Sequence, residues 1–236
     1  MSRGFPIPGA DFSSIAVASE FPVSSAILGD WVFGGTEEAS QRNRFTKADD
    51  IFTGDPGFET DHAQLGIAGG LQSSIVPAGS YSFVYIGELP IVAGESAYIV
   101  GAYSTAGGVG NDGIFLYDNR ITHVFNNGTR GTINRASAAD GVMAGVRVVV
   151  ATYDGEDTGL YVSDGASVLS SVFPGVGANS GAWPFRCGGR TTDSLVGGFR
   201  AYGAKAYDRA LTASEITNKV IPHIREEWAG SDVIVI

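Results

Sequence analysis

Short runs of β-forming residues, separated by turn-forming pairs, recur from Ser80 onward and constrain the fold more than any other feature. Seven runs have the length of strands: residues 81–86, 97–103, 114–117, 121–125, 146–153, 160–162 and 168–173. Asp-Gly or Asn-Gly pairs at residues 112, 127, 154 and 164 fall between or beside them. These residue types tolerate the positive φ of hairpin turns. The spacing, with no helical pattern between the runs, predicts an antiparallel sandwich or barrel.

Two of the runs carry apolar side chains on both faces of the expected strand. In residues 81–86, Tyr81 and Phe83 point one way while Val84 and Ile86 point the other, because side chains alternate along a strand. Residues 148–150 are apolar throughout. We expect both faces of the first strand to be covered and the second strand to be central in its sheet.

One helix is indicated near the end of the chain. Thr212 and Glu215 have the spacing of a capping box, so the helix should begin at Thr212. Its apolar side chains recur every four residues: Ile216, Val220, Ile224 and Trp228. Pro222 should kink or split this helix, whose apolar stripe would cover an edge or face of the sheet.

The first 79 residues are less regular. Residues 27–33 and 65–67 are plausible strands, and residues 68–70 suggest a turn. We divide the chain into an amino-terminal arm, residues 1–25, which would dock on a neighbour, and a sandwich domain, residues 26–236. The apolar residues 233–236 would pair with the sheet or with another subunit.

Charge and composition exclude several classes of partner. A formal net charge of -10 repels a phosphate backbone and an anionic membrane, so we expect neither nucleic acid binding nor membrane insertion. No run approaches the length of a membrane span, and the first 20 residues lack the apolar core of a secretory signal. The single cysteine, Cys187, cannot form an intramolecular disulfide and is expected to be buried.

The carboxy-terminal part of the chain resembles laminin-G-like domains, which belong to the concanavalin A-like jelly rolls. The resemblance rests on a central hairpin, residues 146–155 (VRVVVATYDG) and 159–165 (GLYVSDG), and on a closing block, residues 195–202 (LVGGFRAY) and 205–216 (KAYDRALTASEI). It implies an all-β, two-sheet antiparallel jelly-roll sandwich with a short carboxy-terminal helix. The family usually has Trp and His before the central strand, where this chain has Gly145 and Arg147. Such domains are often carbohydrate-binding or adhesive, and some are glycosidases or lyases.

An enzyme motif is nearly matched at one place. Laminarinase-like members of the superfamily carry Glu-x-Asp-x-x-Glu on one strand, since retaining hydrolysis needs two carboxyl groups about 5 to 5.5 Å apart. Here Glu59 and Asp61 are followed by Gln64, which cannot transfer the catalytic proton, and apolar flanks are missing. We interpret residues 59–64 as a solvated loop, name no catalytic residue and expect the chain not to be an enzyme.

Polar and aromatic residues on the expected loops are candidates for sugar binding, because sugars are held by planar polar groups and aromatic faces. They are Asn111, Asp112, Asn127, Arg130, Asn179, Trp183, Arg186 and Arg190. Trp183 is either a stacking platform or a core tryptophan, whereas Trp31 and Trp228 favour the core. Asn111 and Asp112 suit either a calcium site or a plain hairpin turn; no cofactor is required.

The cysteine-poor, glycine-rich chain also resembles laminin-G-like proteins of phage virions, such as tail fibres, receptor-binding proteins and capsid decorations. This resemblance implies a noncatalytic virion structural or adhesion protein, made in the host cytoplasm and released by lysis. Its partners would be other virion proteins, further copies of itself in a homo-oligomer, and a host-surface glycan. The alternatives are a glycoside-active jelly-roll enzyme, hydrolase or lyase, and a purely structural assembly protein without a ligand.

Overall fold

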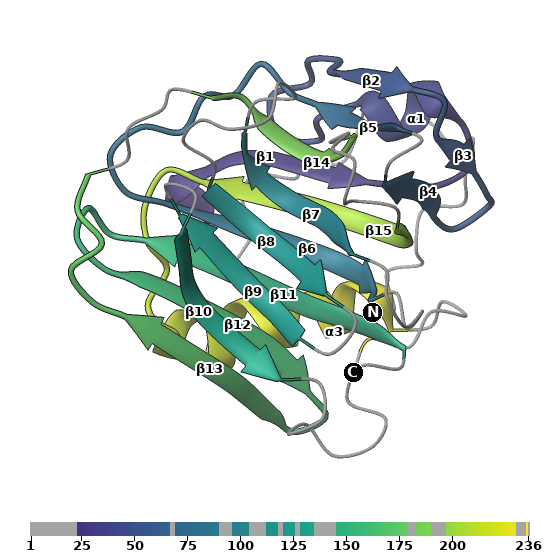
Figure 1. The fold of residues 1–236 in the computed structure, drawn as a ribbon. Helices are drawn as coiled ribbons and strands as arrows, with labels where there is room; N and C mark the ends of the chain where they lie inside the picture. Colours follow the sequence, from purple (N-terminus) through teal and green to yellow (C-terminus); the bar gives the residue numbers. More distant parts are fainter. Residues whose placement is uncertain are drawn as a thin grey trace.

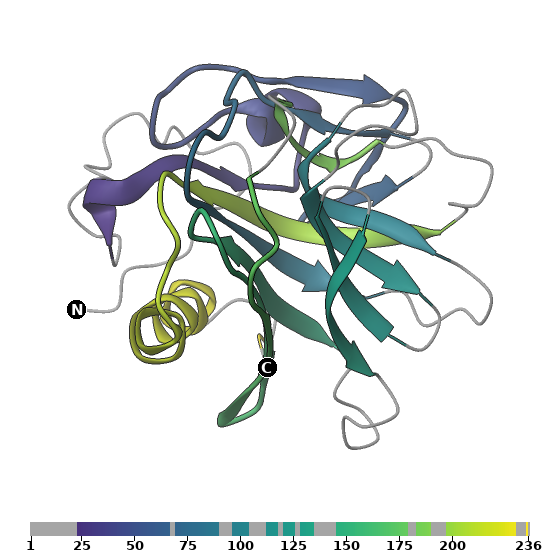
Figure 2. The same ribbon diagram turned by 60° about the vertical axis from the view of Figure 1, so that its left-hand side comes forward.

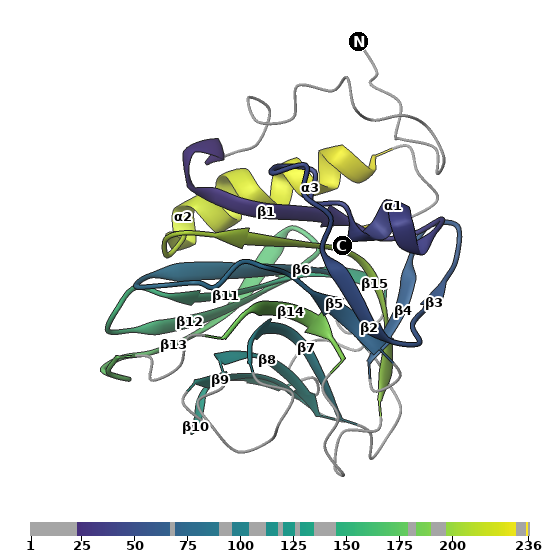
Figure 3. The ribbon, with the colours of Figure 1, turned by 90° about the horizontal axis from the view of Figure 1, so that it is seen from above.

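The computed structural model describes residues 23–66, 69–89, 96–103, 112–117, 120–125, 128–134, 145–178, 183–189, 197–229 and 235. Within these ranges the chain forms two antiparallel sheets that face each other (Figure 1). A carboxy-terminal helix lies on the outer face of one sheet, so three layers are visible from above (Figure 3). The predicted all-β sandwich with a short carboxy-terminal helix is therefore confirmed.

The first sheet has the spatial order β13-β12-β11-β6-β15-β4-β3, and β1 also pairs with β15. Its strands are β1 (Ile27–Val32), β3 (Gly57–Phe58), β4 (Ala63–Gly66), β6 (Tyr81–Glu88), β11 (Val146–Tyr153), β12 (Thr158–Asp164), β13 (Ser167–Phe173) and β15 (Gly198–Tyr207). The long strand β15 pairs with β4 through its first half and with β1 through its second half. Strands β1 and β4 thus lie end to end along β15.

The second sheet has the order β10-β9-β8-β7-β14-β5-β2. Its strands are β2 (Ile51–Gly54), β5 (Gly69–Gln72), β7 (Ala97–Ala102), β8 (Asp112–Tyr117), β9 (Arg120–Phe125), β10 (Gly128–Asn134) and β14 (Phe185–Gly188). The helical elements of the chain are η2 (Ser24–Ala26), α1 (Glu37–Gln41), α2 (Ala213–Glu215), η3 (Ile216–Val220) and α3 (Ile221–Trp228).

All seven strands predicted after Ser80 are present, as are those near residues 27–33 and 65–67. The turn predicted at residues 68–70 is wrong for its last two residues, because Gly69 and Gly70 begin β5. A side chain at Gly70 would place its Cβ 2.3 Å from the backbone of Gly188, so this strand needs glycine to approach its neighbour.

The inner core lies between the two sheets. Trp31 is fully buried and stacks on Phe185, with ring centroids 4.9 Å apart and planes 7° apart. Cys187 is a free, buried thiol in the same cluster, and burial raises its pKa. The predictions of a core Trp31 and a buried Cys187 are confirmed.

An outer core lies between the first sheet and the carboxy-terminal helix. Val84 and Ile86 of β6 and Val148 of β11 pack there against Ile224 and Trp228 of α3. Figure 2 shows the helix alongside the sheet, on the side away from the second sheet. This outer layer explains why β6 and β11 carry apolar residues on both faces, as the sequence predicted.

The helix begins with the predicted capping box: the Thr212 side chain accepts from the backbone N–H of Glu215, whose side chain accepts from the Thr212 N–H. The turns before Pro222 widen into a π-helix, η3, and the Ile221 N–H donates to the Ile216 carbonyl five residues back. Proline lacks an N–H and crowds the preceding turn of an α-helix. The proline therefore splits the helix into α2, η3 and α3 without stopping it.

Two predictions concern the ends of the chain. The predicted arm, residues 1–25, lies outside the described residues except for its last three. Of the apolar residues 233–236 the structure describes Val235, which forms an isolated parallel bridge with Val146 at the start of β11 and so contacts the sheet of its own chain. Among the described residues, no helix is long and apolar enough to cross a membrane.

Candidate functional site

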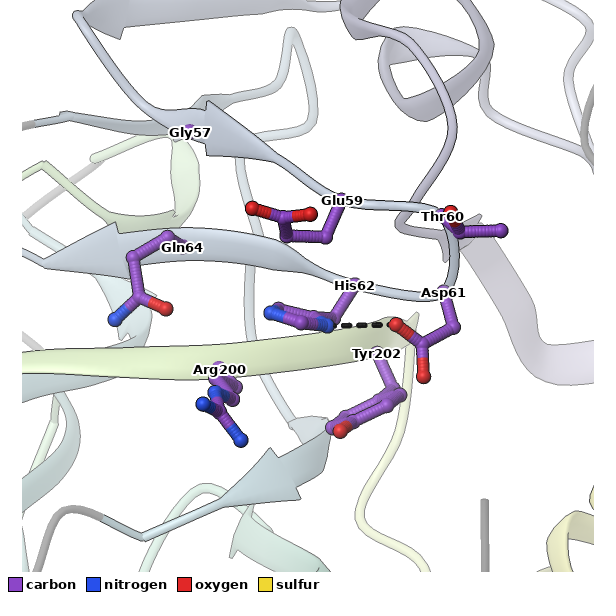
Figure 4. A pocket seen from close by; sticks show the side chains of 8 residues that line it. All are labelled: Gly57, Glu59, Thr60, Asp61, His62, Gln64, Arg200 and Tyr202. Carbon is purple, nitrogen blue, oxygen red and sulfur yellow. Dashed lines mark hydrogen bonds and ion pairs between the residues drawn. The ribbon is translucent and has the colours of Figure 1, made fainter. Parts of the chain in front are cut away.

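A shallow groove of about 610 Å³ lies on the outer face of the first sheet, where β3 and β4 form its edge. Its walls come from the β3–β4 hairpin and from β15 (Figure 4). Eight residues line it: Gly57, Glu59, Thr60, Asp61, His62, Gln64, Arg200 and Tyr202. Most of them are polar or charged.

The alternation of the two paired strands places the side chains of the groove. Arg200 pairs with Gln64, and Ala201 pairs with Ala63, whose side chain packs into the inner core. Because successive side chains point to opposite faces, Gln64 and Arg200 point outward. The next outward positions on the two strands are His62 and Tyr202. These four side chains, His62, Gln64, Arg200 and Tyr202, form what we call the β4–β15 array.

The rim of the groove is the turn between β3 and β4. The Glu59 N–H donates to the His62 carbonyl across 2.9 Å, and the Gly35 N–H donates to the Glu59 carbonyl across 2.6 Å. These bonds fix the backbone, while the side chains of Glu59, Thr60 and Asp61 remain exposed. The interpretation of residues 59–64 as a solvated loop agrees with this geometry for residues 59–62 but is wrong for Ala63 and Gln64, which begin β4. The loop also borders the groove.

His62 is held in place from two sides. Its Nδ1 lies 2.7 Å from Asp61 Oδ1, and its ring lies over the ring of Tyr202, with centroids 5.5 Å apart. The His62 side chain is only 13% exposed, against 47% for Asp61. With Nδ1 directed at the carboxylate, Nε2 is the nitrogen left for a ligand.

Tyr202 and Arg200 share a carboxylate. The Tyr202 hydroxyl donates to Glu88 Oε1 across 3.3 Å, and Arg200 Nη1 lies 3.4 Å from both oxygens of Glu88. Burial, followed by the charges of Glu88 and Asp61, raises the pKa of Tyr202 to about 12. The phenol therefore keeps its proton at neutral pH and acts in this groove as a hydrogen-bond donor.

The groove combines groups that suit hydroxyl-rich ligands. Arg200 and Tyr202 donate, the exposed carboxylates accept, and Gln64 does both. Within the described residues, no group of three or more His, Cys, Asp or Glu side chains is arranged to hold a metal ion.

The candidates named from the loops are not gathered in the groove. Asp112 is fully buried: its carboxylate lies 2.6 Å from His123 Nε2 and accepts from the Tyr81 hydroxyl. Arg186 is buried and its Nε donates to the Tyr103 carbonyl across 3.1 Å. Trp183 is partly buried and packs against the inner core. Four other candidates lie outside the described residues: Asn111, Asn127, Asn179 and Arg190. The backbone of Arg130 is described as part of β10, but its side chain is not.

Sequence reasoning did not find Arg200 and Tyr202 as groove residues. Both belong to the closing block on which the family resemblance rests. The available signal was their alternation with Phe199 and Ala201, which marks two polar positions on one face of a strand.

No family model and no curated protein matches the chain, but solved structures do. Trypanosoma rangeli sialidase in complex with 2,3-difluoro-KDN is 14% identical with a TM-score of 0.59, over 82% of this chain and 32% of the sialidase. The same enzyme's covalent intermediate with 2,3-difluorosialic acid is 13% identical with a TM-score of 0.58, over 90% and 35%. The receptor-binding domain of botulinum neurotoxin mosaic serotype C/D is 11% identical with a TM-score of 0.54, over 81% and 49%.

At these identities the likeness concerns the fold. The chain spans about a third of the length of the sialidases and about half of the toxin domain. The expectation that the chain is not an enzyme is overturned by the sialidases among its structural neighbours, since this architecture occurs in enzymes that act on glycans. The chain is an antiparallel β-sandwich of jelly-roll type, and its fold is shared by part of a sialidase and by part of a toxin's receptor-binding domain.

Proposed function

We propose that the chain is a glycan-binding jelly-roll domain whose ligand lies in the groove beside β4 and β15. The observation that carries this proposal is the β4–β15 array, in which hydrogen-bonding side chains converge on a cavity supported by a rigid sheet. Sugar sites need such placed polar groups. The structural neighbours support the ligand class, because they include a sialidase in complex with sialic acid or a derivative of it, and the receptor-binding domain of a toxin.

The test is a titration of ¹⁵N-labelled protein with a panel of bacterial-surface and host-type oligosaccharides. We expect amide shifts at residues 59–64 and 198–202. Arg200→Ala and Gln64→Ala should each weaken binding by about tenfold, because each removes hydrogen bonds to the ligand. Lys219→Ala, which removes an exposed cation from η3, is the matched control and should bind like the native protein. Binding that is insensitive to both groove variants would reject the site.

Turnover of the glycan in the same groove is a second candidate function. The specific observation is the Asp61–His62 pair, which directs Nδ1 at the carboxylate and leaves Nε2 for a ligand, with the Tyr202 ring 5.5 Å from the imidazole. Incubation with the same panel, followed by an assay for new reducing ends, tests it. Cleavage that is lost in His62→Ala but kept in Lys219→Ala would support this candidate. Oligosaccharides that stay intact with the native protein would reject it.

We further propose that the domain is displayed on a phage particle as a component of the tail or capsid surface. There it would form a homo-oligomer and would also contact other virion proteins. The support is the resemblance of the glycine-rich chain to laminin-G-like virion proteins. Antibody labelling of purified particles from lysed cells, seen by electron microscopy, tests the setting. Absence of label from intact particles would reject it.

A further inference from the structure

We infer that the groove selects neutral glycans over glycans that carry a carboxylate. This inference rests on the proposed function, and it names the class of ligand. It does not follow from the structural neighbours, several of which are bound to sialic acid or its derivatives. It comes from the balance of charge around the β4–β15 array.

The described side chains that surround the groove carry more negative than positive charge. Glu59 and Asp61 stand on the rim of the groove (Figure 4), Arg200 lines it, and Glu88 lies 3.4 Å from the Arg200 guanidinium. Three carboxylates against one guanidinium leave the groove negative whether or not His62 carries a proton. A carboxylated sugar would therefore enter against the local field.

Arg200 is not held ready for an incoming carboxylate. Its Nη1 lies 3.4 Å from both oxygens of Glu88, which also accepts from the Tyr202 hydroxyl. A sugar carboxylate that bound the other N–H groups of Arg200 would leave two carboxylates to share one guanidinium. Like charges brought together in this way oppose binding.

The other cation on the outer face of β15, Lys205, is also paired with carboxylates of its own chain. Lys205 is buried beneath α3, and its Nζ lies 2.5 Å from Asp30 Oδ1 and 3.4 Å from Glu227 Oε2. Lys205 is therefore balanced by its own partners and adds no attraction for an anionic ligand in the groove.

Neutral hydroxyl groups suit the same side chains. The exposed carboxylates of Glu59 and Asp61 accept hydrogen bonds from sugar hydroxyls, and charged acceptors make the stronger bonds. Gln64 offers one acceptor and two donors, while Arg200 keeps N–H groups other than the one directed at Glu88. A neutral hexose oligosaccharide thus gains contacts without adding charge.

The test compares matched pairs of oligosaccharides that differ in the carboxylate: gluco-, galacto- and manno-oligosaccharides against their uronic acid counterparts, with free sialic acid as a further acidic probe. Dissociation constants come from amide shifts of the full chain at residues 59–64 and 198–202. We expect the neutral member of a binding pair to bind at least about tenfold more tightly at low salt, and the gap to narrow as salt screens the charges.

Glu88→Gln provides the second measurement. It removes the carboxylate that occupies Arg200 but keeps an acceptor for Tyr202, so the preference for the neutral member should shrink by about tenfold. Glu156→Gln makes the same change of net charge on the exposed β11–β12 turn and should leave the preference unchanged. Equal or tighter binding of the acidic members by the native protein overturns this inference and leaves the proposed function standing. Absence of groove shifts with every probe rejects both.

Discussion

The side chain of Lys205 is almost completely buried by the fold. Its side chain is 2% exposed, and it contacts the carboxylates of Asp30 and Glu227. Arg44 completes the cluster, 2.6 Å from Asp30 and 2.5 Å from Glu227. Two cations thus face two carboxylates, and each member compensates the burial of the others.

Removing one member should leave a buried charge unpaired. We expect Lys205→Met, which keeps the length of the side chain, to lower the free energy of unfolding by about 3 to 5 kcal/mol in urea titrations. Lys219→Met removes an exposed lysine from η3 and should change it by less than about 0.5 kcal/mol. A loss below about 1 kcal/mol for Lys205→Met would mean that Asp30 is compensated without it.

The same cluster predicts a dependence of stability on pH. Burial alone would raise the pKa of Glu227, but Lys205 and Arg44 outweigh it and lower the pKa to about 2 from its ordinary 4.5. Because the folded state has the lower pKa, this stabilisation is complete above pH 4.5 and is lost as pH falls towards 2. Unfolding measured between pH 5 and 2 should therefore show a smaller loss of stability in Glu227→Gln than in the native protein. Parallel curves would contradict the assignment.

At this scale the sequence predicted apolar residues better than charged ones. Trp31 and Cys187 were expected in the core because their side chains gain by leaving water. Nothing near Lys205 in the sequence indicates its burial, since Asp30 is 175 residues away. Asp112 was expected on a loop for a similar reason, because its partners Tyr81 and His123 lie on other strands.

Among the elements, the carboxy-terminal helix depends on a local signal at its start. Thr212→Ala removes the side chain that accepts from the Glu215 N–H and should lower the free energy of unfolding by about 1 kcal/mol. Thr217→Ala changes the same residue type on an exposed turn of η3 and is the control. Equal effects of the two substitutions on the urea midpoint would show that the cap contributes nothing.

Strands were predicted where their own residues carry the signal. β14 has four residues and ends in glycine, and β10 contains two glycines among mostly polar residues, so neither stands out from the turns around it. The groove was also hard to predict from the sequence, because its residues come from segments far apart in the chain. Residues 59–64 attracted attention as a near-match to an enzyme motif, but their pairing with β15 joins segments more than 130 residues apart. Only the register brings Gln64 opposite Arg200.

For the whole molecule, the first sheet separates two apolar layers. The inner core is shared with the second sheet, and the outer core is shared with the carboxy-terminal helix (Figure 3). The sequence predicted both, through strands that are apolar on each face and a helix with one apolar stripe. The end-to-end placement of β1 and β4 along β15 could not be predicted, because it depends on which partners compete for one strand.

If the two apolar layers are separate, the losses in the free energy of unfolding caused by a substitution in each layer should be additive. Leu160 of β12 belongs to the inner core and Ile224 of α3 to the outer core, and both side chains are fully buried. Leu160→Ala and Ile224→Ala should each lower the free energy of unfolding by about 2 to 5 kcal/mol. Because the residues share no cluster, the double variant should match the sum within about 0.5 kcal/mol in urea titrations. A coupling above about 1 kcal/mol would show that the sheet transmits strain between its faces and that the sandwich and helix form one continuous core.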